Sequence, residues 1–129
     1  MKKSFTIIEL VVAIVIVAIL ASLAISRYSV FKESSLDKEA IANLDLIHIA
    51  EEIRLMETGA YYPATGSTNV IANINSVLKV NISALNWSYT VDGTAQQATA
   101  GRLPSNSRVW TFRFIGNLAT CSGTGCPTT

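Results

Sequence analysis

The feature that most constrains this chain is an uncharged apolar run over residues 10–25, LVVAIVIVAILASLAI, which contains neither Gly nor Pro. With Phe5, Thr6, Ile7 and Ile8 before it, the low-polarity segment covers residues 5–25. As an α-helix this segment is about 31 Å long, enough to cross the core of a bilayer. Little more than a hundred of the 129 residues then remain, so we expect one small domain besides this segment.

Two interpretations of the apolar run are open on composition alone. Lys2 and Lys3 form a basic start that favours a cytoplasmic location for the first residues, as expected for a membrane-spanning helix. The same basic start, followed by an apolar core and the small-x-small sequence Ala24-Ile25-Ser26, is also typical of a cleaved secretory signal.

Helical periodicity continues past the apolar run. Residues 27–57 lack Gly and Pro, and their apolar residues recur three and four apart. Gly59 is typical of a helix end, so we predict one helix over residues 5–58, with 5–25 in the membrane and 26–58 as the spine of a head. The expected apolar face consists of Leu36, Ala40, Leu44 and Ile47, continuing through Leu46, Ala50, Ile53 and Met56, and Asp45, His48 and Glu52 mark the polar side.

Residues 59–129 form the predicted head. Apolar spacing indicates a short helix at about 69–79, and alternation indicates strands at about 84–91, 97–102 and 108–115. The predicted fold class is therefore α+β, a long N-terminal helix packed against a small antiparallel sheet. The strand residues expected to face the helix are Leu85, Trp87, Tyr89 and Val91, and then Trp110, Phe112 and Phe114.

Charge is divided between regions rather than concentrated in a basic patch. The formal net charge is +1, but residues 26–59 sum to −3 and residues 60–129 to +3. A nucleic-acid partner is not indicated, because clustered Lys and Arg with interleaved aromatic residues are absent from the sequence. We interpret Arg102, Arg108 and Arg113 as a solvated face or as partners for the acidic stalk.

The sequence contains no recognisable catalytic motif. A phosphate-binding glycine loop, a metal-ligand spacing and a nucleophile elbow are all missing. His48 has Asp45 and Glu52 three residues before and four after it, which is more typical of a polar helix face than of a general base. We predict that the protein is not an enzyme and uses no cofactor.

Cys121 and Cys126, the only two cysteines, lie in the loop-like sequence C-S-G-T-G-C near the C-terminus. An even count and close spacing favour a disulfide in an oxidising compartment. A loop this short constrains the unfolded chain by roughly 2 kcal/mol. We interpret the pair as a staple for an otherwise loose C-terminus.

Glu9 places a carboxylate directly before the uncharged run. The macrodipole at a helix N-terminus favours a carboxylate there, which makes Glu9 tolerable without explaining its presence. If the chain were cut just before Phe5, a new α-amine would lie four residues before this carboxylate. Two staggered chains could then pair amine with carboxylate at low dielectric, where the attraction is strong.

The start K-K-S-F-T-I-I-E-L followed by an unbroken apolar helix resembles the type IV pilins and pseudopilins, and Gly59-Ala60-Tyr61-Tyr62-Pro63 is similar to the turn that often follows their helix. The resemblance implies a pilin fold and a leader, residues 1–4, that a prepilin peptidase removes by cutting after Ser4. It also implies N-methylation of Phe5 and pairing of Glu9 with the Phe5 amine of a neighbouring subunit. Ser4 stands where the family nearly always has glycine.

The resemblance further implies an inner-membrane precursor that a pilus assembly platform builds into an extracellular helical homopolymer, with minor pilins as further partners. The leading functional prediction is therefore a type IV pilus subunit for attachment, motility or DNA uptake. One alternative is a pseudopilin of a type II secretion or competence system, in a periplasmic filament. The other is a secreted binding domain with an ordinary signal peptide.

Overall fold

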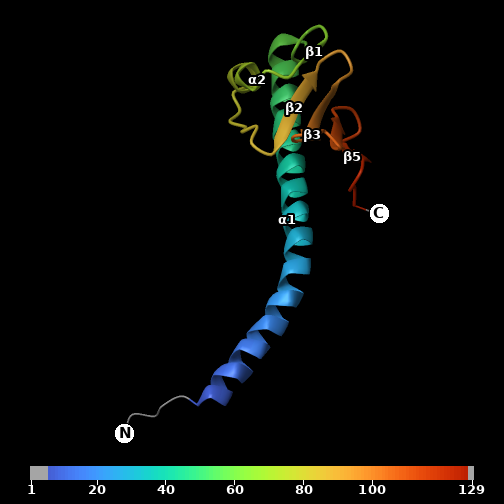
Figure 1. Ribbon diagram of the computed structural model, residues 1–129. Coiled ribbons are helices and arrows are strands. Elements are labelled where there is room, and N and C mark those ends of the chain that lie inside the picture. The colour runs from blue at the N-terminus through green and yellow to red at the C-terminus, as the bar shows by residue number, and fades with distance from the viewer. Residues whose placement is uncertain (1–5, 128–129) are drawn as a thin grey trace. The chain divides into compact units, whose positions relative to one another are not determined.

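The computed structural model describes residues 6–127, which divide between Ser35 and Leu36 into two compact units. The elements are the helices α1 (Ile7–Thr58) and α2 (Ile71–Leu78) and five strands (Figure 1). The strands are β1 (Ser67–Thr68), β2 (Trp87–Asp92), β3 (Gln97–Arg102), β4 (Arg108–Arg113) and β5 (Leu118–Gly123). The predicted α+β fold, a long N-terminal helix packed against an antiparallel sheet, is confirmed.

Helix α1 ends at Thr58, directly before Gly59. Gly59 takes a left-handed conformation with φ of 78°, which glycine adopts without a Cβ penalty. Its N–H donates to the carbonyl of Leu55 over 2.8 Å, and the Thr58 hydroxyl donates to the carbonyl of Arg54 over 2.9 Å. These bonds satisfy carbonyls that the last turn of a helix leaves without partners.

The second unit has a single core between α1 and the sheet. On α1, the buried residues are Ala40, Leu44, Ile47, His48 and Glu51, which lie within about 100° on a helical projection. The first three were predicted to be apolar-face residues. Across from them lie the buried strand residues Trp87, Tyr89, Val91, Ala98, Ala100, Trp110 and Phe112, together with Phe114 after β4.

The prediction for the rest of α1 was wrong on two counts. Leu46, Ile53 and Met56 are exposed, with Met56 at 79%, whereas His48, assigned to the polar side, is buried. The sheet covers one straight face of the helix, and the apolar positions at 46, 53 and 56 are rotated away from it by more than 100°. Burial of His48 and Glu51 follows from their place on the covered face.

The sheet is a meander in which each strand pairs antiparallel with the next, in the order β1-β2-β3-β4-β5. Burial alternates along β2 and β4, so that Trp87, Tyr89 and Val91 face the core. Leu85, expected to belong to this set, precedes β2 and is 79% exposed. The strand predicted at 84–91 thus begins and ends later in the sequence than predicted, at Trp87 and Asp92.

Helix α2 packs on the core through Ile74 and Leu78, and its C-cap residue, Lys79, is left-handed with φ of 55°. Asn75 ties the following loop to the helix, because its side chain both donates to the carbonyl of Ile82 and accepts from its N–H, at 2.9 and 3.0 Å. The two bonds fix the chain that leads from α2 towards β2.

Strand β5 was not predicted, and it changes the interpretation of the C-terminus. Residues 118–123 pair with the whole of β4, including Cys121 opposite Trp110. The segment up to Gly123 is therefore an edge strand rather than a loose tail. Its sequence, LATCSG, has no apolar alternation, and the two-residue strand β1, paired with the end of β2, was missed for the same reason.

Candidate assembly site

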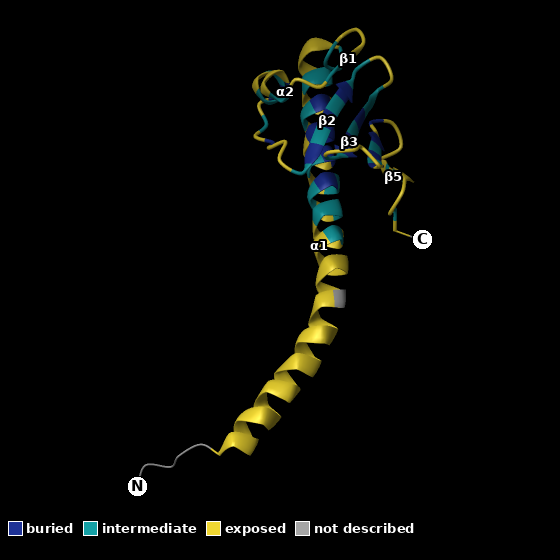
Figure 2. Ribbon diagram, in the orientation of Figure 1, coloured by how far each residue is buried: buried dark blue, intermediate teal, exposed yellow. Residues whose placement is uncertain are grey.

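The N-terminal part of α1 is apolar on every side and uncovered. All side chains from residue 7 to 25 are exposed, and the large apolar ones are exposed by 47% to 84% (Figure 2). Among the described residues, α1 is the one helix that is long and apolar enough, by length and composition, to cross a membrane. Such a surface requires either lipid or other protein around it.

Glu9 lies in the first turn of α1, and Thr6 stands directly before the helix. The hydroxyl of Thr6 accepts from the N–H of Glu9 over 3.4 Å and donates to Oε2 of the same residue over 3.5 Å. Thr6 and Glu9 have the T-x-x-E spacing of a capping box, in which side chains satisfy the orphan N–H groups of a helix start. This contact engages one of the two carboxylate oxygens of Glu9.

Thr6 is a residue that the sequence reasoning missed, although the spacing T-I-I-E would have revealed it. Its contact gives Glu9 a local role in starting the helix, in addition to the predicted role in assembly. Ser4 and Phe5, the predicted cleavage and methylation residues, lie outside the described residues, as does the leader, residues 1–4.

The N-terminal segment matches a known family of signal sequences. Residues 1–25 match the family described as the prokaryotic N-terminal methylation motif. The chain carries a prokaryotic N-terminal methylation motif. This methylation motif is the class III signal of type IV pilins and pseudopilins, and it covers about a fifth of the chain. No curated protein and no solved structure gives a significant match.

Four statements follow from the methylation motif. The motif supports a type IV pilin or pseudopilin-like precursor. The motif points to a structural subunit rather than an enzyme. It implies processing by a prepilin peptidase and assembly into filaments. Together with the apolar start of α1, it fits a precursor located in the inner membrane.

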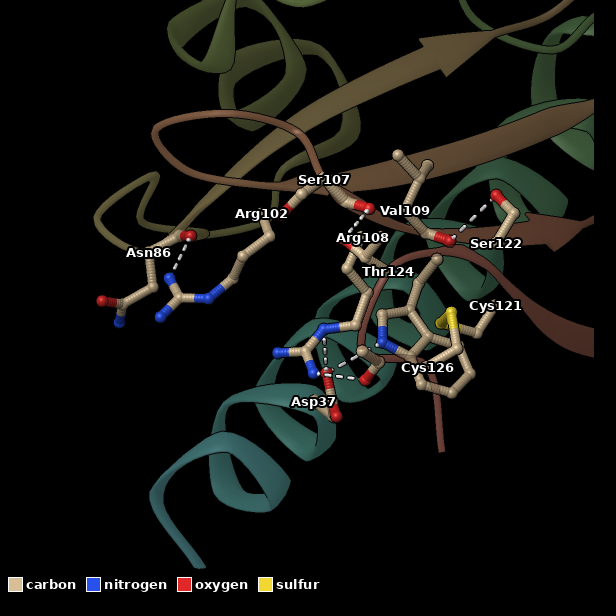
Figure 3. A network of polar contacts seen from close by, with 12 residues as sticks. Asp37, Asn86, Arg102, Ser107, Arg108, Val109, Cys121, Ser122, Thr124 and Cys126 are labelled. Atoms are coloured by element: carbon tan, nitrogen blue, oxygen red, sulfur yellow. Dashed lines mark hydrogen bonds and ion pairs between the residues drawn. A yellow bond between two sulfur atoms is a disulfide. The ribbon is translucent and has the colours of Figure 1, made fainter. Parts of the chain in front are cut away.

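A second set of polar residues holds the C-terminus against α1 (Figure 3). Nε of Arg108, at the start of β4, lies 3.1 Å from Oδ1 of Asp37 in α1, and both side chains are largely buried. The indole N–H of Trp110 donates to the same oxygen over 3.1 Å. Arg108 also donates to the carbonyl of Gly125 over 2.8 Å. The Asp37 carboxylate therefore joins α1 to β4, and Arg108 joins β4 to the C-terminal loop.

The predicted cysteine pair is a disulfide. Cys121 in β5 is bonded to Cys126, with their Cα atoms 5.8 Å apart. Within the closed loop, the N–H of Thr124 donates to the carbonyl of Ser107 over 2.8 Å. A Cβ on Gly123 would overlap the Ser107 carbonyl oxygen, so this position accepts only glycine. The bond thus closes a loop that backbone contacts already hold to the start of β4.

Arg102 and Arg108 do not form the solvated face that was one of the two interpretations for the three arginines of the head. The guanidinium carbons of Arg102 and Arg108 lie 5.6 and 5.7 Å from the ring centre of the buried Trp87. Arg102 also donates to the carbonyl of Asn86 over 2.9 Å. For Arg108, the pairing with Asp37 supports the other interpretation, a partner for the acidic stalk, whereas Arg113 is exposed.

Helix α1 buries two titratable residues, Glu51 beside the turn after the helix and His48 beside aromatic rings of the sheet. Burial raises the pKa of Glu51 to about 7, against lesser opposing effects of a hydrogen bond from the Tyr62 N–H and of the Arg54 charge. The His48 ring lies 5.0 Å from that of Phe112 and 5.7 Å from that of Phe114. Within residues 6–127, no three His, Cys, Asp or Glu residues are grouped to hold a metal ion.

Proposed function

We propose that this chain is the structural subunit of a type IV pilus, a helical homopolymer built from the inner membrane by a pilus assembly platform. The observation that carries this proposal is the combination of the methylation motif with an apolar helix start that is exposed on all sides. In the precursor, lipid covers that surface. In the filament, the same surfaces of neighbouring copies cover one another.

Glu9 is the proposed assembly residue. After cleavage between Ser4 and Phe5, the new α-amine of one subunit pairs with the Glu9 carboxylate of its neighbour, and the attraction is strong because the surroundings are apolar. Of the two carboxylate oxygens of Glu9, the Thr6 hydroxyl contacts Oε2, and Oε1 can accept from the incoming amine. The single carboxylate within residues 5–25 would then set the stagger between adjacent subunits.

The position of the mature N-terminus tests the processing step. We expect N-terminal analysis of the mature protein to begin at methylated Phe5. A mature N-terminus near Arg27 would instead show that residues 1–26 are an ordinary secretory signal, and it would reject the pilin proposal. An uncut chain would show that Ser4 is not accepted in place of glycine.

Filament yield in matched variants tests the role of Glu9. Glu9→Gln keeps the size of the side chain and removes its charge, and we expect it to lower the yield of sedimentable filaments by about tenfold or more without blocking cleavage. Thr6→Val removes the hydroxyl contact and keeps the carboxylate, so it should retain most of the yield. Equal losses in both variants would assign Glu9 to helix capping alone.

A pseudopilin is the second candidate, because pseudopilins carry the same methylation motif. Electron microscopy of cells with and without this gene separates the two. Surface filaments that depend on the gene support a pilus, whereas their absence, together with a filament confined to the periplasm, supports a pseudopilin. Nothing in the fold of the head requires one location over the other.

A further inference from the structure

Four exposed residues follow immediately after the methylation motif on one side of α1. They are Arg27, Tyr28, Phe31 and Lys32, and the two aromatic side chains are exposed by 71% and 73%. At about 100° per residue, the four positions fall within about 140° of the helix circumference. Val30, at the same height and 68% exposed, points to the other side. The helix therefore has an aromatic and cationic face here, which we call the collar face.

The collar face begins where the uncharged span ends. Between Glu9 and Arg27 lie 17 residues without charge, about 26 Å of helix. This is close to the roughly 30 Å thickness of a bilayer hydrocarbon core. Tyr28 and Phe31 then lie about 2 and 6 Å further along the helix than Arg27, within a headgroup layer about 5–8 Å thick on each side of the core. The position of the collar face is thus fixed by the length of the span.

We propose that the collar face of the precursor binds the lipid headgroup layer on the side of the inner membrane opposite the basic leader. The proposal rests on the membrane-inserted precursor stated above. Tyr28 and Phe31 would insert their rings at the level where aromatic side chains collect in membrane proteins. Arg27 and Lys32 flank them and would contact lipid phosphates, with their aliphatic stems against the acyl boundary.

Lipid is the occupant that the chemistry of this face favours. The face is continuous with the apolar span, its two charges are both positive, and phospholipid headgroups present negative phosphates. Because only one side of the helix has this character, the precursor should rotate and tilt so that Tyr28 and Phe31 face the bilayer. The collar face then determines the depth and rotation from which the assembly machinery withdraws the subunit.

Quenching of tryptophan fluorescence by brominated lipid tests the proposal with the full-length chain. The variants Tyr28→Trp and Phe31→Trp are placed in vesicles of phosphatidylcholine with a minority of phosphatidylglycerol, brominated either near the headgroup or near the chain ends. Val30→Trp is the matched control on the other side of the helix, and Ile16→Trp reports on the span. Trp87 and Trp110 are buried in the head, and the unmodified chain measures their contribution.

We expect bromine near the headgroup to quench residues 28 and 31 at least about twofold more than residue 30. Bromine near the chain ends should quench residue 16. Equal quenching at residues 28, 30 and 31 would overturn lipid binding by the collar face. So would quenching at residue 16 with none at residues 28 and 31, and in both cases the inserted precursor would stand. No quenching at residue 16 would overturn the inserted precursor as well. If quenching at residues 28 and 31 rises when the protein is diluted in lipid, a second copy of the chain covers the collar face at high protein density. That result would replace lipid by a second copy as the partner of this face.

Discussion

The backbone N–H of Tyr62 donates a hydrogen bond of 2.8 Å to Oε2 of Glu51. This bond ties the turn after α1 back onto the helix, and the guanidinium of Arg54 lies over the Tyr62 ring at 5.4 Å. Glu51 is fully buried, and its Oε1 has no hydrogen-bond partner in the described part of the chain. The head therefore contains a carboxyl group whose charged form is poorly solvated.

We predict from this contact that the head loses stability as pH rises. The folded-state pKa of Glu51, about 7, lies above its ordinary value of 4.5, so between these values the folded state binds more protons than the unfolded state. The contribution of Glu51 to stability is thus fully present below about pH 4.5 and lost as pH rises through about 7. The difference corresponds to about 3 kcal/mol at most.

Glu51→Gln tests this prediction, because it keeps an acceptor for the Tyr62 N–H and cannot ionise. Urea unfolding of the full chain in detergent, followed by tryptophan fluorescence, should show the variant less dependent on pH between 5 and 8 and more stable than the original chain at pH 8. An unchanged pH dependence in the variant would show that another group causes it. Glu57→Gln, which changes an exposed carboxylate of the last turns of α1, is the matched control.

Substitutions of Asp37 and Arg108, which form an ion pair, should have strongly non-additive effects on the free energy of unfolding. Either Asp37→Leu or Arg108→Met leaves a buried charge without its partner, which we expect to lower the free energy of unfolding by about 3 kcal/mol. The double variant removes both charges and should lose clearly less than the sum. A double-mutant cycle by urea unfolding measures the coupling.

Lys38→Met is the control for this cycle, since Lys38 is the exposed neighbour of Asp37 on α1 and should change stability by less than about 0.5 kcal/mol. Additive losses in the double variant would mean that the two side chains act independently, contrary to the 3.1 Å contact between Asp37 and Arg108.

Loss of the disulfide should affect the C-terminal loop more than the sheet. Cys121→Ser with Cys126→Ser removes the loop constraint, and we expect a loss of about 2 kcal/mol in the free energy of unfolding. Pairing of β5 with β4 and the bond from Thr124 to Ser107 remain. Hydrogen exchange should therefore increase after residue 121 while amides of β4 stay protected. Exposure of β4 amides would show that the disulfide holds the edge strand itself.

Gly93 should not tolerate a side chain. It follows β2, and a Cβ at this position would overlap the carbonyl oxygen of Pro63 in the turn after α1. Gly93→Ala must separate the two segments and should cost about 1–3 kcal/mol, measured by urea unfolding.

Gly59→Ala separates this steric effect from backbone strain. Gly59 has a positive φ but open space around its missing Cβ, so alanine there meets only the conformational penalty, about 1 kcal/mol. A Gly93→Ala variant as stable as the original chain would show that the contact with Pro63 is easily relaxed.

The local elements of this protein were largely predictable because they depend on neighbours in sequence. The absence of Gly and Pro up to Thr58 and the glycine at 59 indicate α1 and its end, and alternation around Trp87 and Trp110 indicates two strands. Strand β5 was not predictable in this way. Its residues are polar and small, and it forms because β4 offers an unpaired edge with six partner positions.

For the candidate assembly site, the sequence by itself determined the chemistry. An uncharged span, one carboxylate before it and the methylation motif are all properties of the first 25 residues, since membrane transfer depends on local composition. Only the tertiary structure decided which side of α1 the sheet covers, and thus that His48 and Glu51 are buried while Leu46 and Met56 are exposed. The periodicity of a helix leaves its rotation open, and the pairing of Asp37 with Arg108, 71 positions apart, is set by that packing.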